Sequence, residues 1–240
     1  MKPVVATPPK VILLDIEGTT TPVSFVHRVL FPYARKILPD LIKRRRHDPV
    51  VEQALAATKL LAPGKEPAEQ LLTWMNEDAK VAPLKTLQGQ AWAEGYADGT
   101  LVASLFPDVP PVLRAWYQTG LTLAVYSSGS SAAQKLIYAH TTDGDLTSLF
   151  SAFLDLEMGG KKDTASYRKI ITTQGWVASD VLFVSDVVAE LDAAGSAGML
   201  TCQMVRTEDE TVAGDDHPVA HDMTEVATLF ALPAPASACL

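Results

Sequence analysis

Short apolar runs in this sequence end in polar residues whose types could do chemistry together. One carboxylate ends the run VILLD, two serines follow LTLAVY, and a Ser-Asp pair follows VLFV. A lysine comes directly after a glycine pair that follows a weaker apolar run. The set comprises carboxylates, hydroxyls and one ammonium group: Asp15, Glu17, Ser127, Ser128, Lys161, Ser185 and Asp186.

These residue types indicate phosphoryl transfer. Carboxylates are the hard oxygen ligands that Mg²⁺ prefers, and Mg²⁺ keeps several waters when it binds to protein. Hydroxyls, backbone N–H groups at helix starts and a lysine suit a phosphate group. A carboxylate nucleophile completes the set, because an aspartate can accept the phosphoryl group as an aspartyl-phosphate.

The spacing of the apolar runs predicts the elements that must hold these groups. Short continuous apolar runs are typical of strands buried on both faces of a parallel sheet, and helical patterns lie between them. The alternation predicts an α/β fold with a doubly wound parallel sheet, in which ligands bind at the carboxyl ends of the strands. We predict strands at 11–15, 121–126, 181–184 and 200–205, a weaker strand at 152–156, and helices at 109–118, 131–140, 164–173 and 187–197.

A long insertion separates the first strand from the others. It shows four helical patterns (25–38, 50–61, 66–80 and 84–97) punctuated by prolines, and it is too long for one crossover helix. Its net charge is +2, whereas the rest of the chain carries −10. We therefore predict a helical cap at 21–105, inserted into a discontinuous core at 1–20 and 106–240 whose last residues, 232–240, form a loose tail.

Composition excludes several other classes of protein. Of the 240 residues, 48% are hydrophobic and 20% are charged, which excludes disorder as the main state. A net charge of −8 disfavours sequence-independent nucleic-acid binding, and we interpret the basic run at 43–46 as a solvated helix end. No apolar run could span a bilayer, and two cysteines without a secretory signal fit a reducing compartment. We expect a cytoplasmic monomer with no nucleic-acid or membrane partner.

Several motifs together resemble one enzyme family. DIEGTT at 15–20 resembles the first motif of the haloacid dehalogenase (HAD) superfamily, and the serine pair, Lys161, and Asp186 with Glu190 fit the other three. LLDIEGTTTP, LKTLQGQ, YSSGS followed by AQKL, and SYRKI are similar to the acireductone synthases, the enolase-phosphatases of methionine salvage. Most of the superfamily has Asp where this chain has Glu17. The resemblance covers about residues 11–206.

The resemblance implies a reaction and a role for each residue. Family members enolise 2,3-diketo-5-methylthiopentyl 1-phosphate and then dephosphorylate it to 1,2-dihydroxy-3-keto-5-methylthiopentene and phosphate. Asp15 becomes the nucleophile, and Glu17 becomes the general acid and base. One Mg²⁺ per chain is held by Asp15, the backbone carbonyl of Glu17 and Asp186. The groups that bind and neutralise the phosphate are Ser127, Ser128 and Lys161.

Some roles stay open on the residues alone. The two serines could cap the following helix whether or not they bind phosphate. Lys161 competes with Lys162, and only the resemblance selects Lys161. Glu190 is either a supporting acid or a surface residue, and His140 fits a structural role better than a catalytic one. The cap is expected to close over the site, with most of its aromatic residues in its own core and some available to the methylthio group.

Three other functions compete with this interpretation. A general HAD phosphatase for another small phosphate ester has the same superfamily motifs. A hydrolytic dehalogenase needs no metal, so the acids at Glu17 and Asp186 disfavour it. A receiver-type signalling module is a phospho-accepting switch and not an enzyme, and it uses similar groups on the same kind of sheet. Its phosphorylated Asp follows a middle strand, whereas Asp15 follows the first strand.

Overall fold

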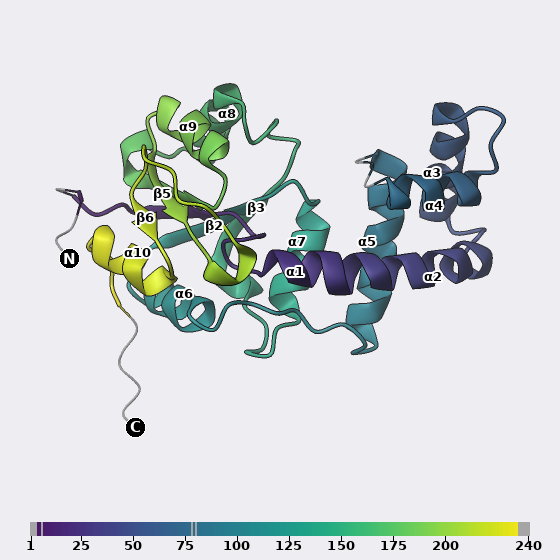
Figure 1. Cartoon of the computed structure of the whole chain (residues 1–240), viewed down its shortest axis with the longest axis horizontal. Coiled ribbons are helices and arrows are strands. Elements are labelled where there is room, and N and C mark those ends of the chain that lie inside the picture. The colour runs from purple at the N-terminus through teal and green to yellow at the C-terminus, as the bar shows by residue number, and fades with distance from the viewer. Residues whose placement is uncertain (1–3, 6, 78, 80, 235–240) are drawn as a thin grey trace. The chain divides into compact units, whose positions relative to one another are not determined.

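Four consecutive apolar residues form the strand at the centre of the fold. In this computed structural model, which describes residues 4–5, 7–77, 79 and 81–234, strand β1 (Val11–Leu14) is buried along its whole length. It pairs in parallel with β2 (Thr122–Tyr126) on one side and with β4 (Val181–Ser185) on the other. Helices cover both faces of the sheet, so every side chain of β1 is apolar (Figure 1).

Six parallel strands form the sheet, in the order β3-β2-β1-β4-β5-β6. The other strands are β3 (Phe150–Leu154), β5 (Leu200–Met204) and β6 (Val219–Ala220). Helices α8 (Thr164–Gln174) and α9 (Val188–Ser196) lie on one face, and α6 (Val109–Gln118), α7 (Ser131–Ala139) and α10 (Met223–Leu229) lie on the other (Figure 1). Short 3₁₀ turns occur at Thr147–Leu149, Ala178–Asp180 and Thr207–Asp209.

This topology confirms the predicted α/β fold with a doubly wound parallel sheet. The strand order reverses direction between β1 and β4, and such a switch point is where ligands bind in open α/β sheets. Strand β6 and helix α10 are additions that the sequence pattern did not predict. A two-residue strand is too short for a pattern to show, and α10 has only seven residues.

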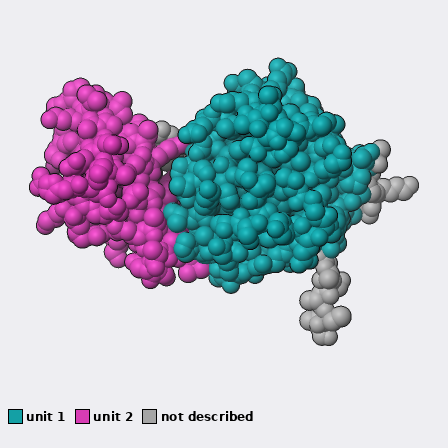
Figure 2. Space-filling view, turned by 180° about the vertical axis from the view of Figure 1, so that it is seen from behind, with its two compact units in different colours: residues 1–23, 103–240 teal, residues 24–102 magenta. Residues whose placement is uncertain are grey.

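A helical insertion lies between β1 and β2, and the chain divides into two compact units, residues 1–23 with 103–240 and residues 24–102 (Figure 2). The second unit has its own apolar core, which includes Leu38, Leu41, Val51, Leu71 and Leu87. Its elements are α1 (Val23–Phe25), the π-helical segment η1 (Val26–Leu30), α2 (Phe31–Arg44), α3 (Pro49–Leu61), α4 (Pro67–Asn76) and α5 (Ala82–Ala97).

The helix predicted at 25–38 does not end before Pro39, so the boundary predicted there is wrong. Helix α2 continues through Pro39 to Arg44. Proline inside a helix removes one hydrogen bond and costs about 3 kcal/mol. Pro39 is exposed, whereas Leu38 and Leu41 beside it are fully buried in the unit's core. Tertiary packing of the apolar face therefore outweighs the local cost.

Side chains at the end of α2 pair with acids of the same unit. Arg44 contacts Asp40 at 2.5 Å and Glu94 at 2.9 Å. Arg45 forms ion pairs with Asp48 and with Glu94. Half of the basic run at 43–46 is thus balanced by neighbouring carboxylates, which agrees with its interpretation as a helix end.

The predicted loose tail, 232–240, is described only as far as residue 234. Within it, the Leu232 N–H donates to Ala227 O at 2.8 Å. The Trp116 indole N–H donates to Pro233 O at 3.0 Å. Residues 235–240, which include Cys239, lie outside the described residues. Among the helices of the described segments, none is both long and apolar enough to cross a membrane.

Candidate active site

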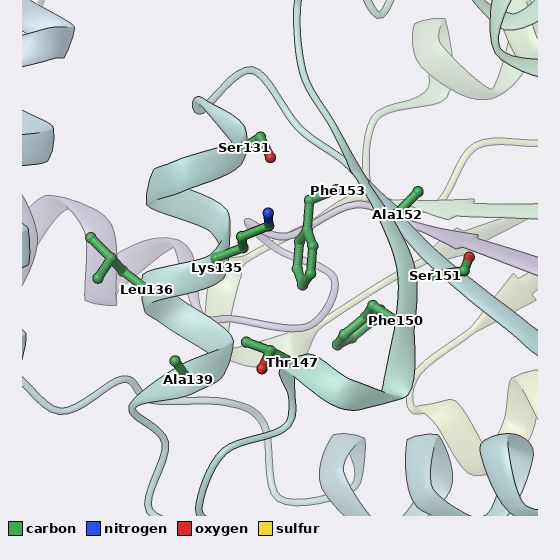
Figure 3. Close-up of a pocket in the computed structure, with 9 residues that line it drawn as sticks. All are labelled: Ser131, Lys135, Leu136, Ala139, Thr147, Phe150, Ser151, Ala152 and Phe153. Carbon is green, nitrogen blue, oxygen red and sulfur yellow. The ribbon is translucent and has the colours of Figure 1, made fainter. Parts of the chain in front are cut away.

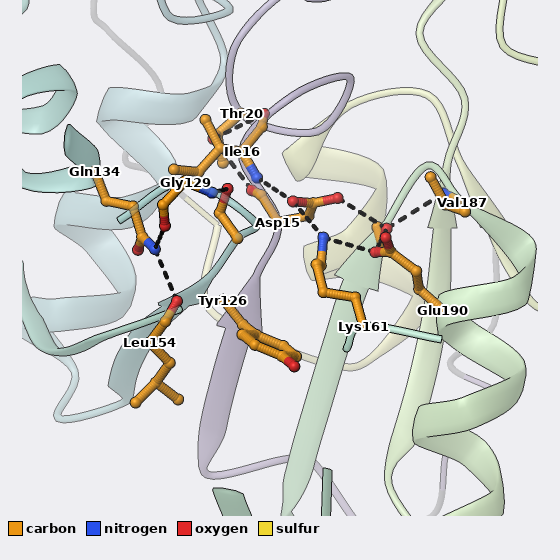
Figure 4. A network of polar contacts seen from close by, with 12 residues as sticks. Asp15, Ile16, Thr20, Tyr126, Gly129, Gln134, Leu154, Lys161, Val187 and Glu190 are labelled. Atoms are coloured by element: carbon orange, nitrogen blue, oxygen red, sulfur yellow. Dashed lines mark hydrogen bonds and ion pairs between the residues drawn. The ribbon is translucent and has the colours of Figure 1, made fainter. Parts of the chain in front are cut away.

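The carboxyl end of β1 brings Asp15 and Lys161 together. Asp15 directly follows β1 and is 5% exposed, and Lys161 is 9% exposed. The Lys161 Nζ atom lies 2.6 Å from Asp15 Oδ1 (Figure 4). Two residues that are far apart in the chain therefore form a buried ion pair at the switch point of the sheet, the edge at which ligands bind in open α/β sheets.

Neighbouring groups hold the Asp15 carboxylate in one orientation. The Ile16 N–H donates to Asp15 Oδ1 at 2.7 Å. The Ser185 hydroxyl, at the end of β4, lies 3.1 Å from Asp15 Oδ2. The Asp15 N–H in turn donates to Val184 O on β4. The carboxylate is thus pre-positioned at the strand end, as a nucleophile must be.

Lys161 also pairs with Glu190, whose role the sequence left open. Lys161 Nζ lies 2.6 Å from Glu190 Oε2, and Glu190 is only 8% exposed on the first turn of α9. Burial opposes the charge of Lys161, but the charges of Asp15 and Glu190 outweigh burial and raise the lysine's pKa. Burial and then the charge of Asp15 raise the pKa of Glu190. Glu190 is therefore not a surface residue, and its role as a supporting acid stays a prediction.

The loop before α8 decides which of the two adjacent lysines enters the site. The Tyr167 hydroxyl donates to Lys161 O at 2.7 Å, and the Tyr126 hydroxyl donates to Gly159 O at 2.8 Å. Gly159 has φ of +126°, and a Cβ there would lie 2.2 Å from the Ser166 hydroxyl, so only glycine fits. These contacts point Lys161 inward, whereas Lys162 is exposed.

Asp186, immediately after β4, lies against the turn that follows Asp15. Gly18 in that turn has φ of +68°, and a Cβ on it would lie 2.5 Å from Asp186 Oδ2. Glycine is required here because the backbone and the carboxylate approach so closely. Burial, followed by the charge of Asp15, raises the pKa of Asp186 to about 7.

The predicted metal ligands fit Mg²⁺ by their chemistry. Asp15 is buried and Asp186 is partly buried, and a divalent cation would relieve the repulsion between these two carboxylates. The Gly18 backbone approaches Asp186 closely, which places the turn that carries Glu17 beside this carboxylate. In the described part of the chain, no three His, Cys, Asp or Glu residues group as metal ligands. The predicted set needs only two carboxylates, Asp15 and Asp186, because its third ligand is the Glu17 backbone carbonyl.

Glu17 lies on the turn between Asp15 and the insertion. Its side chain is partly exposed, and its backbone forms a bridge with Thr21. The Ile16 carbonyl accepts from the N–H groups of Thr19, Thr20 and Thr21, which closes the turn. Glu17 therefore stands on a tightly hydrogen-bonded segment.

The two predicted phosphate-binding serines follow β2 and differ in exposure. Ser127 is buried, and its hydroxyl accepts from the Gly129 N–H at 3.2 Å. Ser128 is exposed. The N-cap of α7 is Ser130, whose hydroxyl accepts from the Ala133 N–H. The capping role considered for Ser127 and Ser128 thus belongs to Ser130, and the serine pair occupies the loop before the helix.

Two residues that hold this loop were not singled out from the sequence. The Gln134 side-chain amide donates to Gly129 O and to Leu154 O, both at 2.8 Å (Figure 4). Asp155 accepts from the Ser131 N–H at 2.9 Å. Gln134 lies within the AQKL motif. The motif therefore pointed to this residue but did not indicate that its side chain holds the loop. Both contacts tie the loop after β2 to the end of β3.

A separate pocket of about 730 Å³ lies between α7 and the edge strand β3 (Figure 3). Its lining includes Phe150, Phe153 and Lys135, whose Nζ lies 5.9 Å from the centre of the Phe153 ring. None of the predicted site residues lines it, so the pocket is distinct from the site around Asp15.

The fold and this site define the class of the protein. A family model described as haloacid dehalogenase-like hydrolase matches residues 9–198, so the chain is a HAD-like hydrolase. The chain is 60% identical over 222 residues to an enolase-phosphatase E1 of Gluconacetobacter diazotrophicus, covering 92% of this chain and 94% of that one. It is 53% identical over 230 residues to an enolase-phosphatase E1 of Acidiphilium cryptum, covering 96% and 99%. The chain belongs to the enolase-phosphatase E1 family, the acireductone synthases of methionine salvage.

A solved structure is similar to this chain over most of its length. The UTR4 protein of Saccharomyces cerevisiae matches with a TM-score of 0.76 and 32% identity, covering 89% of this chain and 98% of that one. The enolase-phosphatase E1 relatives confirm the family, the enolase-phosphatase function and the phosphatase class predicted from the motifs.

Proposed function

We propose that this chain uses Asp15 as the nucleophile to dephosphorylate enolised 2,3-diketo-5-methylthiopentyl 1-phosphate, after catalysing the enolisation in the same site. The observation that carries the proposal is the buried pair of Asp15 and Lys161, 2.6 Å apart at the switch point of the sheet. A phosphate monoester needs a nucleophile and a nearby cation that offsets the charge of its oxygens, and this pair supplies both.

The phosphoryl transfer takes two steps, formation of the aspartyl-phosphate and its hydrolysis. An Asp15 carboxylate oxygen bonds to phosphorus while the bond from phosphorus to the substrate oxygen breaks, and Glu17 donates a proton to that oxygen. Glu17 then takes a proton from water, whose oxygen bonds to phosphorus as the bond to Asp15 breaks. Phosphate leaves, Asp15 is again a carboxylate, and Glu17 again holds the proton that it donates in the first step.

Three groups neutralise the phosphate during these steps. Lys161 keeps its proton because two carboxylates raise its pKa, so it presents a fixed positive charge. Ser127 and Ser128 stand on the loop before α7, where hydroxyl and backbone N–H groups can donate to phosphate oxygens. Preorganised donors of this kind usually contribute the largest part of the rate enhancement.

Mg²⁺ is the cofactor proposed here, one ion per chain. Asp15, Asp186 and the Glu17 backbone carbonyl would hold it. When bound, the ion supplies positive charge that offsets the charge of the phosphate and polarises a carbonyl oxygen of the diketone. A cytoplasmic location and a monomeric state stay predictions.

Phosphate release from the diketo phosphate is the test of the proposal. We expect release together with the ultraviolet absorbance of the enediol product, and loss of both signals when EDTA removes the metal. Phosphate release from simple phosphate esters that equals the release from the diketo phosphate would indicate a general phosphatase. Stable phosphorylation of Asp15 without turnover would instead indicate a receiver-type switch.

Shortening Glu17 tests whether its reach serves proton transfer. Glu17→Asp removes one methylene from a side chain on a tightly hydrogen-bonded turn. The backbone of this turn cannot move to bring the shorter side chain's carboxylate back to the substrate. We expect enolisation to fall by about tenfold or more, because proton transfer needs contact within hydrogen-bond distance, and hydrolysis of p-nitrophenyl phosphate to fall less. Stopped-flow absorbance and phosphate release measure the two reactions. Equal losses would contradict the role of the extra methylene.

A further inference from the structure

Arg206 is a buried arginine that none of the proposed chemical steps uses. It follows β5, a strand that carries no residue of the candidate site, and it is 3% exposed. An arginine is rarely buried unless every charge and donor is paired. Its contacts therefore indicate what it holds in place.

All five N–H donors of Arg206 have a partner. Nε and Nη2 donate to Thr19 O at 3.3 and 2.9 Å. Nη1 and Nη2 form a bidentate pair with the two Asp108 carboxylate oxygens, each at 2.9 Å, and Nη1 also donates to His221 O at 3.2 Å. The guanidinium lies 4.0 Å from the centre of the Phe106 ring. A planar guanidinium with five satisfied donors has one orientation, and lysine cannot reproduce it.

The Thr19 carbonyl that Arg206 binds belongs to the turn that carries Glu17. The N–H groups of residues 19–21 donate to Ile16 O, and the Gly18 N–H donates to Thr21 O at 2.8 Å. The Thr20 hydroxyl lies 2.8 Å from the buried Tyr138 hydroxyl. These bonds link Thr19 to the rest of the turn, so we expect a shift of Thr19 O to displace Glu17 as well.

A second contact from the same segment holds the other end of the turn. Asp209, three residues after Arg206, accepts from the Val23 N–H through both carboxylate oxygens, at 3.1 and 3.0 Å. The segment 206–209 thus forms hydrogen bonds with the chain at Thr19 and again at Val23. These two contacts bracket the residues just after Glu17.

We propose that Arg206 is a positioning residue for the reaction, which acts through Thr19 on the placement of Glu17, with Asp209 supporting it. The inference rests on the acid–base role of Glu17 in the proposed function. Displacement of a catalytic group by about 1 Å can cost about a hundredfold in rate. Substitution of Arg206 is therefore expected to lower kcat and to leave substrate binding nearly unchanged.

A double-mutant cycle between Arg206→Lys and Glu17→Gln tests this coupling. We expect Arg206→Lys alone to lower kcat by about 10- to 100-fold with KM within about twofold. In the Glu17→Gln background the same substitution should change kcat by less than about twofold, because the side-chain carboxylate that Arg206 positions is already absent. Phosphate release from the diketo phosphate and from p-nitrophenyl phosphate gives the rates, so the cycle is readable on either substrate.

Two further variants separate positioning from a loss of folding. Asp209→Ala removes the contact to Val23 from a partly exposed side chain, and it should lower kcat in the same Glu17-dependent way. Arg114→Lys changes an exposed arginine that donates to Asp143 O, and it should leave kcat within about twofold. Thermal unfolding midpoints of all variants show whether they fold.

The outcomes distinguish failure of this inference from failure of the proposed function. Losses from Arg206→Lys and Glu17→Gln that multiply would overturn the positioning role alone. An Asp209→Ala loss that persists in the Glu17→Gln background would overturn it as well. If Glu17→Gln by itself leaves kcat unchanged, the acid–base role of Glu17 fails, and the positioning of Glu17 fails with it.

Discussion

Replacing Asp15 with asparagine is expected to lower kcat for phosphate release by more than about a thousandfold, a barrier increase of ~4 kcal/mol. Asparagine has nearly the same shape but cannot form the acyl phosphate bond, so the first chemical step is lost. The fold should persist, because Lys161 keeps its contact with Glu190 when the charge of Asp15 is removed. Phosphate release gives kcat, and circular dichroism with thermal melting checks the fold.

Asp180→Asn is the matched control for this substitution. Asp180 precedes β4, at the opposite end of the neighbouring strand, and pairs with the exposed Lys10 at 2.7 Å. The same change of carboxylate to amide there should leave kcat within about twofold, since an exposed ion pair contributes little. If Asp15→Asn keeps activity within about tenfold of the wild type, Asp15 is not the nucleophile.

Replacing Lys161 with methionine is expected to impair both stability and activity. Methionine removes the ammonium that lies 2.6 Å from Asp15 and from Glu190, and leaves two buried carboxylates facing each other. Breaking a buried pair in this way costs about 3–5 kcal/mol of the free energy of unfolding. Activity should fall by about 10²- to 10³-fold, because one preorganised donor to the transition state is gone. Denaturant titration and phosphate release measure the two effects.

Two companion variants make the test specific. Lys162→Met changes the exposed neighbour of Lys161, and should change the free energy of unfolding by less than about 0.5 kcal/mol. Adding Glu190→Gln to Lys161→Met removes one unpaired carboxylate, so stability should recover by about 1 kcal/mol or more while activity stays low. If Lys161→Met lowers the free energy of unfolding no more than Lys162→Met does, the ion pairs of Lys161 do not stabilise the site.

The strand-end residues could be predicted because buried parallel strands are conspicuous in a sequence. The continuous apolar run of β1 and that of β4 each stop at the sheet's carboxyl edge, so the polar residue that follows lies where ligands bind. Asp15 and Asp186 were therefore identified by position alone. The family motifs added which chemistry the set performs.

Residues that act through distant partners could not be predicted in the same way. Arg206 follows a strand just as Asp186 does, yet it binds Thr19 and Asp108 and is not among the groups around Asp15. Pro39 is a helix breaker by local rules, but the packing of Leu38 and Leu41 carries the helix through it. In both cases the outcome depends on contacts that local preferences do not contain.

By itself, the sequence determined the parallel α/β sheet, the helical insertion, the family and the set of chemical groups at the strand ends. It did so because burial on both faces and alternating strands and helices leave a pattern in the residue order. Only the tertiary structure decided how those groups pair. Lys161 faces inward and Lys162 outward because Tyr126 and Tyr167 hold the loop, and Glu190 joins the site because α9 packs beside β4. Such pairings arise from atoms that meet only after the chain has folded.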